Sequence, residues 1–426
     1  MGIMKIQRPR GTADMLPDEA RRWHFVEDVI RQVAMLYNYR EIRTPIFEST
    51  DLFIKSEGES TDIVSKQMYT FKDRAGRSLT LRPEMTPNVI RAYLEHSLNQ
   101  KEKLIKLYYV GPIFRYEKPQ AGRYRQHHQF GIEAIGSAEP ALDAEVVEMI
   151  MYLYHKLGLT GLKAIINSVG CRKCRPAYNA LLKNYLGTKM RELCADCRRR
   201  AEANPLRVFD CKEPLCSAAL CQAPRVCDNL CDACRDHFRT FRALLEESGI
   251  DYQVTPELVR GLDYYTRTAF EIVSEDLGAQ NAVGGGGRYD DLIESLGGPP
   301  TPAIGFGTGL ERILMVMEER GVAVADEGAL SVYLVAWEKE GMDAGRKLLR
   351  SLRRGGVSAD MDYRMSSLKS QLRRADRLGA PFILLLGKDE RARGTAKLRN
   401  MKTGDEREIA LDGATESIRQ LTGSRG

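Results

Sequence analysis

The sequence predicts a multidomain α+β protein, with a core of strands and helices, a cysteine-rich insertion and a C-terminal α/β module. Three observations support this prediction. The chain has 426 residues, 43% of them hydrophobic, which is enough to bury more than one core. All ten cysteines lie between Cys171 and Cys234. From Val332 onward, strand-like and helix-like segments alternate as in a compact α/β unit.

The first part of the chain opens with a helix and continues with strands. Behind Pro17-Asp18, apolar residues recur at helical spacing, which predicts a helix over Asp18–Tyr37. β-favouring residues then predict strands, and a longer apolar-periodic segment predicts a second helix. The strands are expected at Glu41–Ile46, Lys106–Arg115 and Gln129–Ile135, and the helix at about Ala141–Leu157.

Past the cysteines, strands are expected at Tyr252–Thr255 and Thr268–Val273. A glycine run, Gly284–Gly287, follows, and the block Ala303–Glu319 ends in a helix. The acidic, small-residue stretch Gly321–Gly328 reads as a linker, so the first core should close before it.

The last module is predicted as strand, helix, helix, strand, hairpin and final helix. From Ser331 onward there are 20 basic and 13 acidic residues, so the positive charge of the chain is concentrated here. This charge is compatible with a polyanion partner or with an ordinary solvated surface. Candidate phosphate contacts on the second helix are Arg373, Arg374 and Arg377. The elements are expected at Val332–Trp337, Met342–Arg354, Leu368–Leu378 and Phe382–Leu386, with the hairpin around Thr403-Gly404.

Membrane association and export are not expected. No apolar run approaches the roughly 18 residues of a membrane span. Met1–Pro9 has no apolar segment that would suit a signal peptide, and Ile6 stands where the myristoylation pattern needs Ser or Thr. We therefore expect a cytoplasmic protein.

Three segments carry side chains suited to anionic substrates. In the loop after Phe114-Arg115-Tyr116-Glu117, the guanidinium groups of Arg115, Arg123 and Arg125 match phosphate and carboxylate oxygens, although an ordinary charged hairpin looks similar. Leu258–Glu271 places Arg260 and Asp263 among aromatic residues, shortly before the glycine run. Gly305, Gly307 and Gly309 leave one strand face bare, which suits a flat adenine ring, and Arg312 follows.

Together these segments resemble histidyl-tRNA synthetases over essentially the whole chain. Arg-Thr-Pro-Ile-Phe-Glu around Pro45 is similar to class II motif 1, the dimer-interface motif. Phe114 through Glu133 is similar to motif 2, and Gly305–Arg312 to motif 3. Leu258–Tyr265 and Gly284–Tyr289 resemble the two histidine signature peptides. In Arg82-Pro83-Glu84-Met85-Thr86, Met85 replaces the usual Gly, for which we expect only a local backbone adjustment.

The resemblance implies a class II synthetase catalytic domain with an antiparallel sheet flanked by helices. This domain would comprise residues 1–169 and 257–325, around a cysteine-rich insertion at 170–256. Residues 331–426 would form an α/β anticodon-binding domain. The implied enzyme is a cytoplasmic homodimer that activates L-histidine with ATP and Mg²⁺ and transfers it to tRNA(His).

The resemblance also assigns site residues. Arg115 and Arg260 would stabilise the α-phosphate during activation, and Arg260 would also bind the histidine carboxylate. Arg123 and Arg312 would bind the γ-phosphate, and Glu117 would contact adenine. The α-amino group of histidine would be held by Glu84, Thr86 and Gln129. The imidazole would be held by Glu133 and Tyr264, with Tyr265 nearby. Lys118 and Gln120 would meet the acceptor end of tRNA.

The cysteines suggest metal binding. Three Cys-x-x-Cys pairs and four further cysteines could supply two tetrahedral zinc sites, using eight thiolates. Reduced structural thiols are the main alternative, followed by iron–sulfur or redox chemistry. With Pro205, Pro214 and Pro224 and few large apolar residues, the segment should have little core of its own. The candidate ligands are Cys171, Cys174, Cys194, Cys197, Cys211, Cys216, Cys221, Cys227, Cys231 and Cys234.

Three alternative functions are less favoured by the sequence, and each can be distinguished from a histidine-specific synthetase. A synthetase-like regulatory subunit of ATP phosphoribosyltransferase lacks the last domain and the Arg260 peptide, and both are present here. A non-catalytic RNA-binding module would not need the ATP and histidine residues. A class II enzyme of another specificity would be separated by ATP–pyrophosphate exchange with each amino acid.

Overall fold

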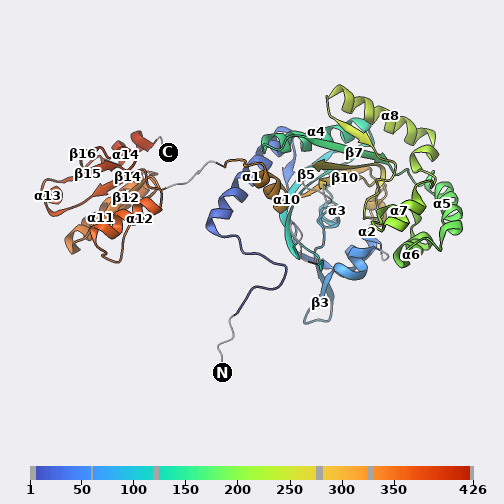
Figure 1. Cartoon of the computed structure of the whole chain (residues 1–426), viewed down its shortest axis with the longest axis horizontal. Helices are drawn as coiled ribbons and strands as arrows, with labels where there is room; N and C mark the ends of the chain where they lie inside the picture. The colour runs from blue at the N-terminus through green and yellow to red at the C-terminus, as the bar shows by residue number, and fades with distance from the viewer. Residues whose placement is uncertain (1–5, 59–60, 119–123, 275–281, 325–329, 423–426) are drawn as a thin grey trace. The chain divides into compact units, whose positions relative to one another are not determined.

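The structure is a computed structural model, which describes residues 6–58, 61–118, 124–274, 282–324 and 330–422. The chain divides into two compact units, Met1–Val324 and Ala325–Gly426. Figure 1 shows their secondary-structure elements. Within the described ranges, no helix combines the length and the apolarity that a membrane span requires.

An eight-stranded sheet forms the centre of the first unit. Its strand order is β1-β5-β6-β11-β10-β9-β7-β8. The inner pairings are antiparallel, whereas the two edge pairs, β1 with β5 and β7 with β8, are parallel. The antiparallel character that the family resemblance implied is thus confirmed. The strands are β1 Arg40–Glu41, β5 Ile105–Phe114, β6 Gln126–Ile135, β7 Leu162–Ser168, β8 Tyr252–Val254, β9 Thr266–Ser274, β10 Ala282–Arg288 and β11 Ala303–Gly309.

Helices cover one face of this sheet and bury the main core against it (Figure 1). The helices are α1 Pro17–Leu36, α4 Pro140–Lys156, α8 Asp232–Glu247 and α10 Leu310–Glu319. Because side chains alternate along a strand, Phe130, Ile132 and Phe306 face this core. Their neighbours Gln129, Glu133 and Gly305 therefore project to the opposite face, where the site described below is located.

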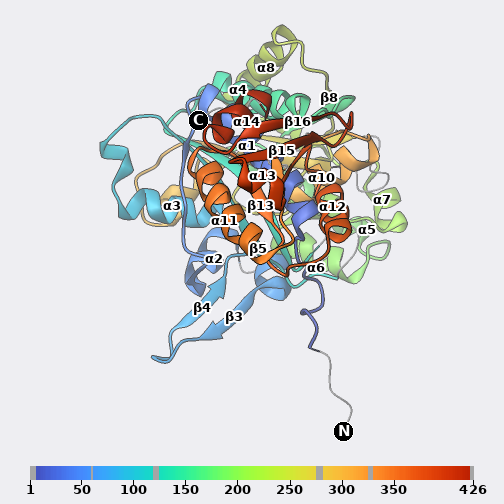
Figure 2. The ribbon, with the colours of Figure 1, turned by 90° about the vertical axis from the view of Figure 1, so that its left-hand side faces the viewer.

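A three-stranded sheet, β2-β4-β3, lies beside the large one, and its β3–β4 hairpin projects from the unit (Figure 2). The expected strand Glu41–Ile46 is wrong beyond Glu41. Pro45 has no N–H to donate, and the carbonyl of Thr44 accepts a 2.9 Å bond from Nη1 of Arg82 instead of pairing in a ladder. The elements here are β2 Phe47–Ser49, α2 Thr50–Glu57, η1 Ile63–Gln67, β3 Tyr69–Lys72, β4 Ser78–Leu81, α3 Thr86–Glu95, η2 Leu98–Gln100 and, after β10, α9 Leu292–Ser295.

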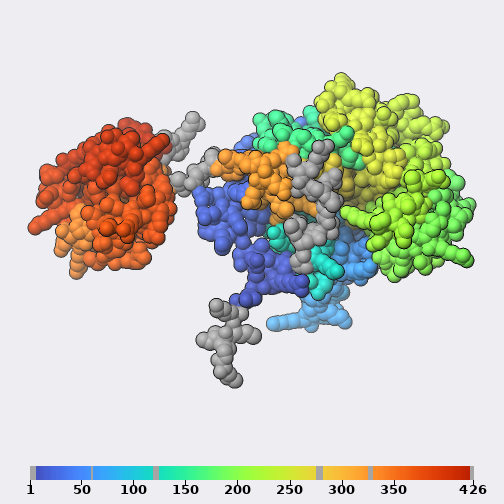
Figure 3. All heavy atoms as spheres, viewed as in Figure 1, coloured from blue at the N-terminus to red at the C-terminus, as the bar shows by residue number. Residues whose placement is uncertain are grey.

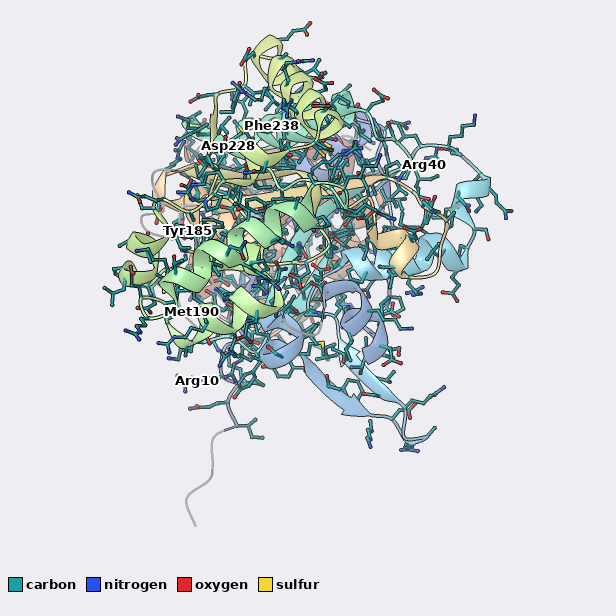
Figure 4. The ribbon with its side chains drawn as sticks, turned by 90° about the vertical axis from the view of Figure 1, so that its right-hand side faces the viewer. Arg10, Arg40, Tyr185, Met190, Asp228 and Phe238 are labelled. Atoms are coloured by element: carbon teal, nitrogen blue, oxygen red, sulfur yellow. The ribbon has the colours of Figure 1, made fainter. Side chains whose placement is uncertain are left out.

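The cysteine-rich segment folds as a helical lobe on the first unit (Figure 3, green). The expectation that it has little core is wrong. Tyr178, Leu182 and Leu186 recur at a spacing of four on α5 and are buried with apolar residues of the following helices. Figure 4 looks onto this lobe and labels Tyr185 and Met190. Its helices are α5 Arg175–Lys189, α6 Ala195–Ala203, η3 Pro205–Asp210, α7 Pro214–Leu220 and η4 Val226–Asn229.

The second unit is the predicted α/β module. Its five-stranded sheet has the order β13-β12-β14-β15-β16, parallel across the first three strands and antiparallel after them. Strand β13 and helix α13 were not predicted. The elements are β12 Val332–Val335, α11 Lys339–Arg354, β13 Ala359–Met361, α12 Leu368–Arg377, β14 Phe382–Leu385, α13 Lys388–Ala392, β15 Thr395–Asn400, β16 Glu406–Ala410 and α14 Ala414–Thr422.

Candidate active site

A cavity of about 310 Å³ lies on the sheet face opposite the core helices. It is lined by β5, β6, β10 and β11, by the turn before α3, and by the loop between β8 and β9. The structure therefore brings together segments that are up to about 230 residues apart in the sequence. The predicted site residues along its wall are Glu84, Thr86, Arg115, Glu117, Gln129, Arg260, Tyr264, Tyr265 and Arg312.

Glu133 is fully buried and is surrounded by hydroxyl groups. Its Oε1 accepts hydrogen bonds from Thr86 Oγ1 at 2.6 Å and from the Tyr109 hydroxyl at 3.1 Å. Its Oε2 accepts a hydrogen bond from the Tyr289 hydroxyl. Burial raises the pKa of Glu133 to about 8, although the three hydroxyls partly offset this effect. The carboxyl group is thus held in one orientation and titrates near neutral pH.

Two glycines of β11 make room for side chains of the neighbouring strand β6. A Cβ atom on Gly305 would lie 2.0 Å from Oε2 of Glu133, and one on Gly307 would lie 2.1 Å from Nε2 of Gln129. We expected Gly305 and Gly307 to leave one face of β11 bare for adenine. At these two positions the side chains of Glu133 and Gln129 occupy that face instead. Oε1 of Gln129 is buried and has no hydrogen-bond partner among the described residues, so it can accept a hydrogen bond from a ligand.

A pair of buried carboxyl groups borders the cavity. Glu84 accepts a 3.2 Å hydrogen bond from the Tyr264 hydroxyl, and Glu57, at the end of α2, faces Glu84. Burial and the adjacent Glu84 raise the pKa of Glu57 well above its ordinary value. Burial also raises the pKa of Glu84, and the hydrogen bond with Glu57 and the charge of Arg115 partly offset this rise. Burial and the adjacent carboxyl group therefore favour the protonated form of Glu57.

The guanidinium groups of Arg115, Arg260 and Arg312 place positive charge on the cavity wall. Nε of Arg115 donates a 2.7 Å bond to the carbonyl of Pro83, and Arg312 donates to the carbonyl of Ala282. Arg260 pairs with Glu271 of β9. Each arginine is thus oriented by the protein before any substrate binds.

Two uncharged side chains, those of His127 and Tyr265, lie near these arginines. Burial and the Arg115 guanidinium lower the pKa of His127 to about 3, so this imidazole is neutral at physiological pH. The ring of Tyr265 lies 6.0 Å from the Arg260 guanidinium carbon, a cation–π distance. The cavity therefore presents three guanidinium groups, of which Arg260 is paired with Glu271, together with the carboxyl groups of Glu84, Glu117 and Glu311. Such a mixed wall suits a substrate with both anionic and cationic groups.

The motif 2 loop is only partly described. Gln120 and Arg123 lie outside the described residues. Lys118 is exposed and is not among the residues that line the cavity. The roles predicted for these three residues remain predictions.

Several residues of the site were not singled out from the sequence. Tyr109 could not have been found from the sequence, because only the strand register places it opposite Gly131, where a Cβ would lie 2.3 Å from the tyrosine hydroxyl. Tyr289 stands in a quoted signature peptide, but no role was assigned to it. Glu57 and Glu271 carry no sequence signal, because nothing in their flanking residues indicates burial or an arginine partner.

The cysteines gather into two quartets that could each hold a metal ion. The first quartet is Cys171, Cys174, Cys231 and Cys234, and the second is Cys194, Cys197, Cys211 and Cys216. Within each quartet the sulfur atoms lie within 4.8 Å of one another. Cys221 and Cys227 belong to neither, so the structure groups eight of the ten candidate ligands.

Comparisons with known proteins cover both units. The family model described as "Histidyl-tRNA synthetase" matches residues 11–313, and the one described as "Anticodon binding domain" matches residues 331–421. The histidine–tRNA ligase of Moorella thermoacetica is 50% identical over 98% of this chain and 99% of its own length. That of Desulforamulus reducens is 49% identical over 96% of this chain and 97% of its own length.

A solved structure agrees with these relatives. The crystal structure of the apo histidyl-tRNA synthetase of S. aureus superposes with a TM-score of 0.84 at 40% identity, over 97% of this chain and 100% of that one. These matches cover nearly all of both partners in each comparison. The chain belongs to the histidyl-tRNA synthetase family.

Proposed function

We propose that the chain is a histidine–tRNA ligase, which forms histidyl-adenylate and pyrophosphate from histidine and ATP and then transfers histidine to the 3′ end of tRNA(His). The observation that carries this proposal is the buried carboxyl group of Glu133 among the hydroxyls of Thr86, Tyr109 and Tyr289. Glu133 itself does not line the cavity, but its partners Thr86, Tyr109 and Tyr289 do. The arrangement would offer a fixed acceptor for an imidazole N–H directly behind the wall of a cavity that also carries cations for a nucleotide.

Activation needs electrostatic stabilisation more than a base. The histidine carboxylate itself attacks the α-phosphorus of ATP, the bond to the bridging oxygen breaks, and pyrophosphate leaves with the electron pair. Arg115 stabilises the developing charge on the α-phosphate, and Arg260 holds the histidine carboxylate against it. Arg123 and Arg312 bind the γ-phosphate and Glu117 contacts the adenine side. Mg²⁺ bound with ATP would supply further positive charge to the triphosphate.

Recognition of histidine uses both ends of the amino acid. Glu84, Thr86 and Gln129 accept hydrogen bonds from the α-ammonium group, and the free Oε1 of Gln129 supports this role. Glu133 and Tyr264 bind the two imidazole nitrogens, with Tyr265 beside them. An amino acid without these nitrogens would lose the hydrogen bonds to Glu133 and Tyr264, which is the proposed basis for its rejection.

The tRNA would contact both units. Lys118 and Gln120 are assigned to its acceptor end. Arg373 and Arg377 are exposed on α12 beside a shallow surface groove, whereas Arg374 is half-buried. We therefore assign the two exposed arginines to phosphate contacts. Residues 1–169 and 257–325 would form the catalytic domain around the insertion 170–256, and residues 331–426 the anticodon-binding domain.

A homodimer is part of the proposal. Ile46 and Phe47 are 44% and 51% exposed, in the segment similar to the class II dimer motif, and burying them against a second copy would remove apolar surface from water. The enzyme would act in the cytoplasm, where protein synthesis takes place. We also propose that structural Zn²⁺ is bound in the cysteine-rich lobe.

The regulatory-subunit alternative is disfavoured by two findings. Residues 331–421 match an anticodon-binding domain, and full-length relatives at about half identity are histidine–tRNA ligases. The direct test is aminoacylation with radiolabelled histidine and tRNA(His), with tRNA that lacks its terminal adenosine as the control. Label should accumulate only on intact tRNA. A chain that binds histidine but charges neither tRNA would contradict the proposal.

A further inference from the structure

The two cysteine quartets have the dimensions of tetrahedral zinc–thiolate sites. In the first, the sulfur of Cys171 lies 3.8 Å from those of Cys174 and Cys231, and Cys174 lies 3.9 Å from Cys234. In the second, Cys194 and Cys211 are 3.9 Å apart. Zn–S bonds of about 2.3 Å give a regular tetrahedron S···S edges of about 3.8 Å. A disulfide would need about 2.05 Å, so these separations match metal coordination instead.

Backbone N–H groups point at the sulfur atoms in both quartets. The amide of Cys194 lies 3.1 Å from the sulfur of Cys216, and that of Cys197 lies 3.4 Å from the sulfur of Cys194. In the first quartet, the amide of Lys173 lies 3.4 Å from the sulfur of Cys171. Donors in these positions stabilise thiolates and orient them toward a shared ion. Zn²⁺ is favoured because four soft thiolates in a tetrahedron suit it and need no redox partner.

The lobe that contains these quartets also holds the loop that carries Arg260. Residues 258–265 have no helix or strand of their own. Val259, next to Arg260, is buried in the apolar cluster of the cysteine-rich lobe. Nδ2 of Asn204 donates a 2.7 Å hydrogen bond to Oδ1 of Asp263. Asn204 lies between Cys197 and Cys211, two members of the second quartet, so an ion there would fix its position.

The first quartet borders the same loop. Arg175, which directly follows Cys174, donates hydrogen bonds to the carbonyls of Tyr265 and, at 3.2 Å, Val169. Leu258 is held from the other side, by a 2.9 Å bond from Asn167 of β7 to its carbonyl. The loop is thus held from the large sheet at Leu258 and, through Glu271, at Arg260. From the cysteine-rich lobe it is held by Asn204 at Asp263 and by Arg175 at Tyr265.

We propose that each quartet binds one Zn²⁺ and that the two ions hold the cysteine-rich lobe in the shape that positions Arg260, Tyr264 and Tyr265 at the cavity. The ions would act as structural struts. Binding releases the protons of the four thiols to water and involves no oxidation or reduction. The effect on activity rests on the proposed function, whereas the metal sites do not.

Metal content tests the sites directly. Elemental analysis of the full chain, purified without chelator, should find two zinc ions per chain. Cys216→Ser and Cys234→Ser should each retain one ion, whereas the control Cys221→Ser/Cys227→Ser should retain two. Less than one zinc per chain in the wild type, iron in its place, or two ions in Cys216→Ser would overturn the assignment.

A second measurement avoids variants that fail to fold. The wild-type chain produced in zinc-depleted, cobalt-supplemented medium should bind two Co²⁺ and show the visible absorption of tetrahedral cobalt with thiolate ligands. Cobalt-free protein, or cobalt without thiolate absorption, would contradict the two tetrahedral sites.

Asn204→Ala tests the strut without touching a metal ligand. Thr188→Ala is the matched control, because Thr188 also makes one side-chain hydrogen bond in the lobe, 2.7 Å to the carbonyl of Tyr185, but faces no loop residue. Asn204→Ala should keep two zinc ions, while amide hydrogen exchange over residues 258–265 should become about tenfold faster. Equal rates of amide hydrogen exchange over residues 258–265 in the two variants would contradict the proposal that the lobe positions this loop.

Histidine activation gives the functional readout. Asn204→Ala should lower kcat for histidine-dependent ATP–pyrophosphate exchange about tenfold with the KM for ATP unchanged, because Arg260 would be less well positioned. Thr188→Ala should match the wild type, and equal kcat values in the two variants would contradict the link to Arg260. A wild-type chain with two zinc ions and a protected loop but no histidine activation would refute the proposed function alone.

Discussion

The hydroxyl of Thr86 donates a 2.6 Å hydrogen bond to Oε1 of Glu133, and this bond connects the start of helix α3 with strand β6. It joins a residue assigned to the α-amino group of histidine to the residue assigned to its imidazole. In the proposed function, the two ends of the substrate would be recognised by groups that hold each other in place.

Because burial raises the pKa of Glu133 to about 8, we expect histidine binding to depend on pH. Below pH 8 the empty site holds a protonated carboxyl, which must lose its proton before it can accept an imidazole N–H. The KM for histidine in pyrophosphate exchange should therefore rise as pH falls from 8.5 to 7, a range above the titration of free imidazole near 6.5. In Glu133→Gln the KM should be higher and nearly independent of pH. The same pH slope in this variant would exclude Glu133 as the titrating group.

Glu57 should make the first unit less stable as pH rises. Because its pKa is raised on folding, the folded state binds the proton more tightly than the unfolded state, and stability is lost above the unfolded pKa of about 4.3. Glu57→Gln removes this loss, so its Tm relative to wild type should increase between pH 5 and pH 8. Glu319→Gln, on an exposed position of α10, is the control. A Tm difference that stays constant or shrinks with pH would contradict the buried proton.

Arg288 is expected to stabilise the fold and to take no part in the reaction. It is fully buried with Asp143, and its Nη2 lies 2.6 Å from Oδ1 of that residue. Arg288→Ala would leave a buried carboxylate unpaired and should lower the free energy of unfolding by about 3–5 kcal/mol. The control Arg172→Ala removes an exposed pair with Asp291 and should cost at most about 1 kcal/mol.

The unfolding of the first unit can be followed in a Trp337→Phe background. The chain has two tryptophans, and this change leaves Trp23 of α1 as the single reporter in a urea titration. If Arg288→Ala lowered the free energy of unfolding no more than Arg172→Ala does, the buried pair of Arg288 and Asp143 would contribute little to stability.

The exposed arginines of α12 should affect tRNA and leave histidine activation unchanged. Arg373→Ala/Arg377→Ala removes two candidate phosphate contacts and should weaken tRNA binding about tenfold, with a smaller dependence on salt. Pyrophosphate exchange should not change, since both residues belong to the second unit. Arg419→Ala, on α14, is the control. Unaltered tRNA affinity in the double variant would remove α12 from the interface.

Long periodic segments were predictable from the sequence. The helix predicted at Asp18–Tyr37 and the strand predicted at Lys106–Arg115 correspond to α1 and β5 with ends within a residue. The β3–β4 hairpin was missed although Tyr69–Lys72 and Ser78–Leu81 both alternate aromatic or apolar with polar residues, because each strand has only four residues and β3 is largely exposed. The segment after Glu41 was wrongly predicted as a strand because its residues favour β structure. Their sequence could not reveal that the Arg82 side chain donates hydrogen bonds to the carbonyls of Thr44 and Pro45.

The candidate site was predictable where it follows sequence motifs. Arg115, Gln129 and Arg260 were named from such motifs and line one cavity. Glu57 was not predictable, because its burial depends on how α2 packs against the loop that contains Asp263. The pairing of cysteines was also open, since only the fold brings Cys171 to Cys231 across 60 positions.

The most direct test of the account is ATP–pyrophosphate exchange with each of the amino acids in turn, for the wild type and for Arg260→Ala. Exchange should depend on histidine alone. Loss of the Arg260 cation should reduce it by about a hundredfold or more, because a fixed charge at the developing transition state contributes on the order of 3 kcal/mol. Arg242→Ala, which changes a surface contact with Tyr252, should keep the wild-type rate. Exchange driven by another amino acid, or histidine-dependent exchange that survives Arg260→Ala at a near-normal rate, would contradict the account.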